Sequence, residues 1–223
     1  VSASFLIPVA GNDLPGVVGF RDLDDVTAML KAAQTPAGKA VVIGGGLLGL
    51  EAAAALNEQG MDVTVLHLMG HLMDRQLDPA AGYLLQQELQ SRGIKVICKA
   101  HTKAILGKDH VDAVLMEDGT VHGADLVVMA AGIRPEVRLA NDSGLHVERG
   151  IVVDDTLLTS DPDVFAVGEC VEHDRTVYGL VAPLFDMAKV LAQTLIGQPA
   201  GFVAPAVSTK LKVTGVDLFS VGD

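Results

Sequence analysis

The hydrophobic pattern of residues 40–66 alternates between short apolar runs and one helical stretch. Residues 40–43 form a β-rich apolar run, which a glycine cluster follows directly. The next segment, residues 50–59, is rich in Ala and Leu and ends at Gly60, which suits the position after a helix. Residues 62–66 form a second apolar run of strand length. The pattern predicts a strand, a helix and a second strand.

A second helix and a third strand are predicted to follow. Asp78 suits the N-cap and Pro79 the first helical position, and the apolar periodicity continues to Arg92, with Gly93 closing the helix. Residues 94–98 then form a third apolar run. Because apolar strands alternate with helices over short connections, the pattern predicts a parallel sheet covered by helices.

The periodicity changes after residue 100. Residues 102–122 contain short alternating stretches, and the pair Asp118-Gly119 is a strong hairpin-turn signal. We therefore expect a small antiparallel meander, followed by a buried strand over residues 125–130. The fold class is thus α/β, with a Rossmann-like parallel sheet and a small antiparallel β-meander.

Beyond Gly132 the chain is predicted to form shorter elements. We expect a brief strand over residues 165–167, a helix that Pro183 opens and Gly197 ends, and two strands within residues 202–223. The apolar face of that helix would hold Leu184, Met187, Ala188, Leu191 and Leu195.

Composition excludes several classes of protein. Of 223 residues, 49% are hydrophobic and 20% charged, which excludes a disordered chain, and the formal net charge of −12 disfavours nucleic acid and anionic membranes as partners. The longest uncharged stretch, residues 190–209, is interrupted by glycine and proline and predicts no membrane span. Two distant cysteines give neither a disulfide framework nor an iron–sulfur motif.

The glycine cluster carries the candidate chemistry. Gly44, Gly46 and Gly49 form a GxGxxG motif that follows a strand and opens a helix. In such a loop the first glycine permits the tight turn, the second lets the backbone approach a pyrophosphate, and the third allows close packing of helix on strand. The alternative is a glycine-rich turn without a ligand.

If the glycine loop binds a dinucleotide, the residue at the end of the second strand is predicted to face the adenosine ribose of that ligand. An acid usually occupies this place, about 20 residues after the motif begins, and here it is His67, with Arg75 the next cation. Without a cation between His67 and Asp74, we expect NADH to be favoured over NADPH. The alternative is a histidine without a role. His67 and His71 have metal-ligand spacing, but Gly70 interrupts any helix there, and we expect no metal site.

Of three other side chains that could carry chemistry, two leave alternatives open. Glu51 either reaches toward the nicotinamide or occupies the exposed face of the first helix. Cys98, in an apolar strand, is expected to pack in the core. Cys170 is either an ordinary thiol or, with a lowered pKa, a reactive one.

Three segments resemble the pyridine nucleotide–disulfide oxidoreductase superfamily of flavoproteins. They are GGGLLGLEAA, AAGIRP (130–135) and TSDPDVFAVGEC (159–170). The resemblance implies an NAD(P)H domain inserted into an FAD domain. It also implies flavin contacts from Gly168, from Glu169 in place of the usual aspartate, and from Arg21, whose alternative is a solvated loop arginine.

A finer resemblance is to the large subunits of NAD(P)H-dependent nitrite reductases. HLMGHLMDRQLD, GECVEH, YGLVAP and STKLKVTGVDLFSVGD carry it. It implies electron flow from NAD(P)H to FAD, and onward through iron–sulfur centres and sirohaem, which reduces nitrite to ammonia. The FAD domain's own GxGxxG and the cluster cysteines do not occur in this chain, which begins on Val1. We therefore expect a middle slice of a larger cytoplasmic enzyme, with an incomplete FAD site and no activity alone.

Taken together, pattern and resemblance predict domains and sites. Residues 1–24 and 133–200 would be pieces of the FAD domain, 25–132 the NAD(P)H domain, and 201–223 the start of a C-terminal interface domain through which the protein dimerises. The predicted NAD(P)-binding residues are Gly44, Gly45, Gly46, Leu47, Leu48, Gly49, Glu51, His67, Arg75, Ala131 and Gly132. The predicted FAD-binding residues are Arg21, Gly168, Glu169 and Ala182. The alternatives are a rubredoxin or ferredoxin reductase and a non-catalytic NAD(H) sensor.

Overall fold

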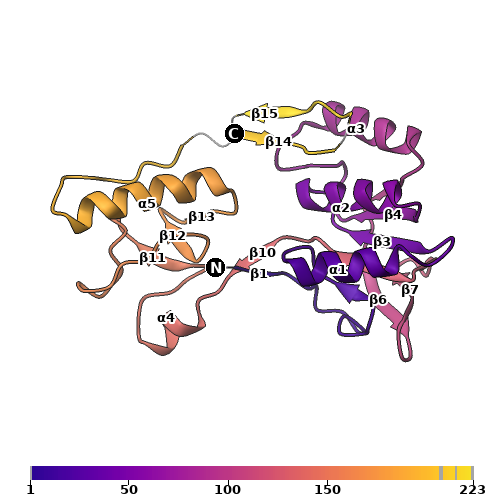
Figure 1. Cartoon of the computed structure of the whole chain (residues 1–223), viewed down its shortest axis with the longest axis horizontal. Helices are drawn as coiled ribbons and strands as arrows, with labels where there is room; N and C mark the ends of the chain where they lie inside the picture. The colour runs from indigo at the N-terminus through magenta and orange to yellow at the C-terminus, as the bar shows by residue number, and fades with distance from the viewer. Residues whose placement is uncertain (1, 206–207, 214, 222–223) are drawn as a thin grey trace. The chain divides into compact units, whose positions relative to one another are not determined.

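The structure, a computed structural model, describes residues 2–205, 208–213 and 215–221 (Figure 1). The chain divides into two compact units. The first unit comprises Val1–Ala3 and Ile133–Ala206, and the second comprises Ser4–Gly132 and Val207–Asp223.

The second unit is built on a five-stranded, all-parallel sheet. The strand order is β2-β9-β3-β4-β5. The strands are β2 (Val17–Val18), β3 (Lys39–Ile43), β4 (Asp62–His67), β5 (Lys95–Cys98) and β9 (Leu126–Met129). Because β9 pairs with β3, the strand order reverses beside β3, at whose end the glycine motif begins. The predicted parallel sheet is confirmed.

Both faces of this sheet are buried, which explains its continuous apolar strands. Alternate residues point to opposite faces, so that Val42 joins one core cluster and Val41 the other. The first cluster packs under the helices α2 (Leu47–Glu58) and α3 (Pro79–Ser91), where Leu50 and Leu89 are fully buried. Burial of each such leucine contributes about 1.5–3 kcal/mol to stability.

The helix boundaries follow from local chemistry. In α3, the Asp78 carboxylate accepts a hydrogen bond from the Ala81 amide at 2.7 Å, and Pro79 occupies the first turn, as predicted. The helix α1 (Leu23–Ala32) has an equivalent cap, because Asp22 accepts hydrogen bonds from the amides of Asp24 and Asp25. In contrast, α2 begins after Gly46 without any capping side chain.

The opposite face of the sheet is covered by the predicted antiparallel meander. Its strands are β6 (Thr102–Gly107), β7 (Val111–Met116) and β8 (Val121–Gly123). At the turn between β7 and β8, Asp118 accepts a hydrogen bond from the Thr120 amide, while Gly119 has a φ of +88°. Hydrogen bonds from the backbone and the side chain of Thr120 lower the pKa of the exposed Asp118 carboxyl. The hairpin predicted from Asp118-Gly119 is confirmed.

The two ends of the chain contribute to this second unit. Residues 4–24 belong to it because Val17 and Val18 pair with β9, although the prediction assigned residues 1–24 to the FAD domain. The predicted C-terminal strands are present as β14 (Ser208–Lys210) and β15 (Phe219–Val221), an antiparallel pair. Leu211 and Val213, between them, are buried in the core cluster under α2 and α3. The tail therefore packs with the sheet unit.

The first unit holds the shorter elements. They are β1 (Ser2–Ser4) paired with β10 (Ile133–Pro135), the small helix α4 (Arg138–Asp142), the three-stranded sheet β11 (Ile151–Val153), β12 (Val171–His173) and β13 (Thr176–Val177), and the helix α5 (Val181–Leu195). Its core cluster contains Val153, Leu157, Val171, Tyr178, Met187 and Phe202.

Two predictions for the first unit are wrong. Residues 165–167 form no strand, only an isolated bridge between Phe165 and Leu158, because turns capped by Asp154 and Asp161 shape this segment. The helix begins at Val181 rather than Pro183. Pro183 is tolerated there because first-turn amides have no partner within a helix.

The buried face of α5 also differs in part from the prediction. Met187 is buried, and Leu184 and Leu191 pack against the core, as expected. Ala188 and Leu195 are exposed, and Pro183 and Val190 complete the inner face instead.

Candidate dinucleotide site

The glycine loop, residues 44–49, joins the end of β3 to the start of α2, and its backbone packs closely at Gly44 and Gly49. Gly44 has a φ of +124°, and a Cβ there would lie 2.3 Å from the Ala130 carbonyl oxygen. A Cβ on Gly49 would lie only 2.0 Å from the Gly44 carbonyl oxygen. Both positions therefore require glycine, since the helix packs directly on the turn and the turn on the end of β9.

Gly46 differs from its neighbours in the loop. A Cβ there would meet no atom within 4 Å, and the residue has an ordinary extended conformation with φ −86° and ψ −174°. Packing does not require glycine at this position. The space beside Gly46 is open, and a side chain would fill it.

The amino end of α2 faces the same opening. The amide of Leu50 makes the first intrahelical hydrogen bond, to the Gly46 carbonyl, so the amides of Leu47, Leu48 and Gly49 precede the helical ladder. No side chain caps this end, and the first turn holds no acidic residue. Uncapped amides and the positive end of the helix dipole make such a terminus suitable for an anion.

Gly45, in contrast, has both of its backbone groups occupied. Its amide donates to His67 Nδ1 at 3.0 Å, and its carbonyl accepts from the Met73 amide at 2.9 Å. A Cβ on Gly45 would overlap the Leu72 and His67 side chains. Its amide is thus turned away from the open space beside Gly46, although the prediction included Gly45 in the binding set.

His67 ends β4, as predicted, but its side chain is 92% buried against the glycine loop. Nδ1 accepts the hydrogen bond from Gly45, and Nε2 lies 3.1 Å from Asp74 Oδ1, within ion-pair distance although not in hydrogen-bond geometry. The residue predicted to face the ribose therefore has its acceptor nitrogen already engaged within the protein.

The remaining predicted dinucleotide residues are dispersed around this loop. Glu51 is half-buried and accepts a hydrogen bond from the Lys212 amide at 3.0 Å, which neither of its two predicted roles included. Arg75 is exposed in the segment after β4, and Ala131 and Gly132 are exposed just after β9.

Three of the predicted flavin residues lie in the first unit. Gly168 has a φ of +102°, with open space where a Cβ would be. Ser2 Oγ donates to Glu169 Oε2 at 2.6 Å, and Ala182 is exposed in the first turn of α5, which has no capping side chain. Arg21 is exposed in the second unit, where its amide donates to Asp25 Oδ2.

Sequence reasoning missed several polar residues near these sites. Asp74 was noted only as the end of a stretch without cations, yet its carboxylate faces His67. In the first unit, the buried Glu172 accepts hydrogen bonds from the amides of Arg149 and Gly150. Burial, with the charge of Asp174, raises the pKa of the Tyr178 hydroxyl in the same unit. No spacing in the sequence pointed to these contacts.

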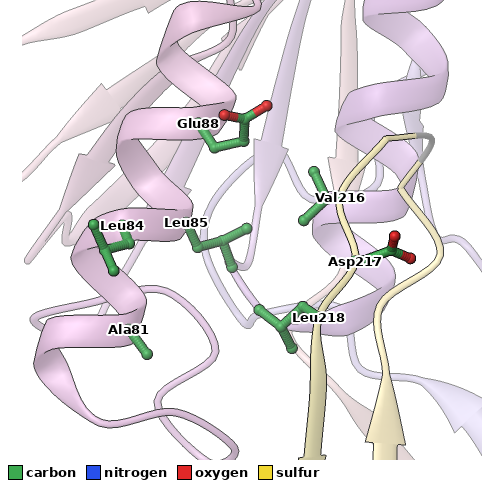
Figure 2. A pocket seen from close by; sticks show the side chains of 7 residues that line it. All are labelled: Ala81, Leu84, Leu85, Glu88, Val216, Asp217 and Leu218. Carbon is green, nitrogen blue, oxygen red and sulfur yellow. The ribbon is translucent and has the colours of Figure 1, made fainter.

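Other candidate features lie elsewhere. Among the described residues there is no group of three or more metal-ligating side chains and no helix long and apolar enough to cross a bilayer. Both cysteines are free, and burial raises the pKa of the Cys98 thiol. A shallow hollow of about 260 Å³ lies between α3 and the segment before β15, and no residue of the glycine loop lines it (Figure 2). Its lining residues are Ala81, Leu84, Leu85, Glu88, Val216, Asp217 and Leu218.

Comparison with known proteins places the chain among flavoprotein reductases. The family model "Pyridine nucleotide-disulphide oxidoreductase" matches residues 2–189. The chain is 50% identical over its full length to a nitrite reductase [NAD(P)H] of Bacillus subtilis (strain 168). It is 45% identical, over 99% of its length, to an assimilatory nitrate reductase electron transfer subunit of the same organism. It spans only 28% and 29% of these two proteins.

Solved structures confirm the fold. A NAD-dependent persulfide reductase from A. fulgidus superposes with a TM-score of 0.91 at 28% identity, covering 96% of this chain and 41% of that one. A ferredoxin reductase from Rhodopseudomonas palustris superposes with a TM-score of 0.86 at 29% identity, covering 93% of this chain and 53% of that one. The α/β class and the resemblance expected from the sequence are both confirmed. The chain belongs to the pyridine nucleotide-disulphide oxidoreductase family.

Proposed function

We propose that this chain binds NADH at the glycine loop and forms the pyridine-nucleotide part of a flavoprotein reductase of the nitrite reductase type. One observation carries the binding site. Gly46 opens onto free space at an uncapped helix terminus, where packing does not require glycine. A pyrophosphate needs such a backbone approach and such amides.

In this proposal, backbone groups hold the diphosphate. The amides of Leu47, Leu48 and Gly49 would donate to its oxygens, and the α2 dipole would add about 0.3–1 kcal/mol for each anionic group. This arrangement suits a chain with a net charge of −12, because the backbone amides and the helix dipole give a local positive potential without a cluster of cationic side chains.

The carboxyl ends of the parallel strands supply the rest of the proposed site. Ala131 and Gly132, exposed after β9, would border the nicotinamide half, because β9 and β3 meet where the strand order reverses. Leu68 and Met69, exposed after β4, would lie on the adenine side. Their backbone is fixed by the amide of Lys99, which donates to the Met69 carbonyl.

We propose that NADH is preferred over NADPH. The Asp74 carboxylate, held beside His67 at the end of β4, places a negative charge on the side of the loop where the extra phosphate of NADPH would sit. A second anion there would be repelled. Arg75, next in the chain, is the one feature that argues for NADPH.

The first unit would carry part of an FAD site. Gly168 leaves room for a close approach, and the uncapped first turn of α5 at Ala182 can donate to an acceptor. Glu169, whose Oε2 accepts a hydrogen bond from Ser2, would accept a further hydrogen bond from a hydroxyl of the ligand. FAD, when bound, would accept a hydride from NADH and pass its electrons on.

Within the complete enzyme, we propose that these electrons reach nitrite through iron–sulfur and sirohaem centres carried by other parts of the protein. The 50% identity to a nitrite reductase supports this terminal acceptor, whereas the ferredoxin reductase shares only 29%. We further propose a cytoplasmic location, consistent with two free thiols, and dimerisation through the C-terminal region, where Phe219 and Val221 are exposed.

Two measurements test the proposal. Titration of this chain with NADH, followed by nucleotide fluorescence, is expected to saturate at one site, and no binding would refute the site. The full-length gene product is then assayed for NADH-dependent conversion of nitrite to ammonia. A product that reduces a ferredoxin or rubredoxin but not nitrite would refute the nitrite assignment while leaving the NADH site intact.

A further inference from the structure

The segment after β4 holds the glycine loop from one side. The Gly44 amide donates to the Leu66 carbonyl at 2.9 Å, and the Gly45 amide donates to His67 Nδ1. The Met73 amide in turn donates to the Gly45 carbonyl, and Met73 has a positive φ of 50°. The peptide groups on both sides of Gly45 are therefore fixed, one through its N–H and the other through its carbonyl.

The contact between His67 and Gly45 defines the state of the imidazole. Nδ1 accepts from the Gly45 amide, so it carries a lone pair and no proton. The ring proton then sits on Nε2, which lies 3.1 Å from Asp74 Oδ1. The carboxylate favours this tautomer, because a partial positive charge faces it.

We propose that His67 is a positioning residue for the dinucleotide. As a neutral imidazole it orients the glycine loop, and Asp74 keeps the imidazole in the tautomer protonated at Nε2. The inference rests on the proposed NADH site. It replaces the direct ribose contact predicted from the sequence. If the Gly44–Gly45 peptide that His67 holds rotates, Gly46 and the amides that follow it no longer face the same open space.

Protonation of His67 would remove this support. An imidazolium carries a proton on both nitrogens, so Nδ1–H would oppose the Gly45 N–H and the hydrogen bond would be lost. Histidine changes charge between about pH 5 and 8, within the range of a binding experiment. We therefore expect affinity for the pyrophosphate to fall as the pH falls.

Few charged groups lie near the ring. Asp74, on the segment after β4, is the charged side chain in ion-pair distance of the ring among the described residues. Cys98 is the register partner on β5, but its thiol contacts Gln86. On α2, the Glu51 carboxylate is turned to the Lys212 amide.

The proposal is tested with ADP-ribose, which contains the pyrophosphate and survives acid, by calorimetric titration between about pH 8 and pH 5.5. Wild-type affinity is expected to fall at least fivefold over this range. His67→Leu, which removes the acceptor, is expected to bind at least tenfold more weakly at about pH 8. His67→Asn places an amide oxygen where Nδ1 lies, and is expected to restore binding within about threefold and to abolish the pH dependence.

Two further variants separate positioning from general stability. In Asp74→Asn, the carboxylate that faces Nε2 is removed, and affinity for ADP-ribose at about pH 8 is expected to fall by less than in His67→Leu. His101→Asn, at an exposed histidine of the same unit, is expected to leave the profile unchanged. Equal affinity of His67→Leu and wild type, or a pH dependence that persists in His67→Asn, would overturn the proposal.

Imidazole nitrogen NMR of the ligand-free chain distinguishes failure of this inference from failure of the NADH site. We expect a neutral His67 with the proton on Nε2 at about pH 8. The opposite tautomer would refute the positioning role whether or not a nucleotide binds. If the expected tautomer is found but ADP-ribose does not bind, the proposed function is refuted. The positioning role of His67 then fails as well, because no ligand is bound at the loop.

Discussion

Replacement of Gly46 by valine isolates the proposed phosphate contact from the fold. The position has an extended backbone that any residue can adopt, and a Cβ there meets nothing within 4 Å. Valine destabilises the helix start because it is a poorer N-cap than glycine. It also lowers the conformational entropy of the unfolded chain, which stabilises the fold by about 0.4–1 kcal/mol. We therefore expect the free energy of unfolding to change by less than about 1 kcal/mol.

The effect of Gly46→Val on binding is expected to be much larger. The new side chain fills the open space, so the pyrophosphate can no longer approach the amides of Leu47 and Leu48. A hydrogen bond to a charged group contributes about 1.5–3 kcal/mol. Loss of a single such bond lowers the affinity by at least tenfold, or about 1.4 kcal/mol.

The matched control is Gly49→Ala in the same motif. Its Cβ would lie 2.0 Å from the Gly44 carbonyl oxygen, a backbone atom that cannot move without displacing the turn. Overpacking of this kind costs about 1–3 kcal/mol. Thermal unfolding and NADH titration of both variants should show stability retained and binding lost in Gly46→Val, and stability lost in Gly49→Ala.

One result would refute this reasoning. If Gly46→Val unfolds at the wild-type temperature and binds NADH with wild-type affinity, the pyrophosphate does not lie against the amino end of α2. The nucleotide would then have to bind elsewhere on the chain.

Three further predictions concern other parts of the molecule. Glu51→Ala should make the C-terminal hairpin more sensitive to protease, because the Lys212 amide loses its acceptor, while Glu51→Gln keeps an acceptor and NADH affinity stays within about twofold in both; a Glu51→Ala tail as resistant as wild type would contradict this. In Asp154, burial would raise the carboxyl pKa, but hydrogen bonds from Thr156 and the Leu158 amide outweigh it and lower the pKa. That stabilisation is present above about pH 4 and is lost as the pH falls through the lowered folded-state value. Because the carboxyl is exposed and screened by solvent, Asp154→Ala should destabilise the first unit by no more than about 1 kcal/mol at neutral pH and should flatten the acid limb of its unfolding curve. Finally, the one GxGxxG motif in these 223 residues is assigned to NADH, so the FAD site lacks a glycine loop of its own. The purified chain should therefore be colourless between about 350 and 500 nm and should not oxidise NADH with artificial acceptors. Stoichiometric bound flavin would contradict the proposal that the FAD site is incomplete in this chain.

The sequence by itself determined the sheet unit of this protein. Residues 40–43, 62–66 and 94–98 were identified as strands because both faces of a parallel sheet are buried, which leaves continuous apolar runs. The boundaries of α3 followed from Asp78 and Pro79, whose effects extend over only a few residues. Local chemistry was sufficient wherever neighbours in sequence were also the interacting groups.

Only the tertiary structure decided what the polar side chains of the candidate site contact. The sequence placed His67 at the end of a strand, but its acceptor is used by Gly45, 22 residues earlier, and its other nitrogen faces Asp74. Glu51 contacts Lys212, 161 residues away in the chain. Such contacts leave no periodicity in the sequence, because they depend on which segments the folded sheet brings together.

The same reason explains the errors in the first unit. Residues 165–167 have the apolar character of a strand, but turns held by Asp154 and Asp161 leave them a single bridge. Short elements gain little from their own propensity, so the packing of their neighbours determines whether they form. Four strands of the five-stranded sheet could be predicted because their sequences are mainly apolar, whereas the two-residue strand β2 was not predicted. The contacts of its functional loop could not, because each is a single hydrogen bond between residues distant in sequence.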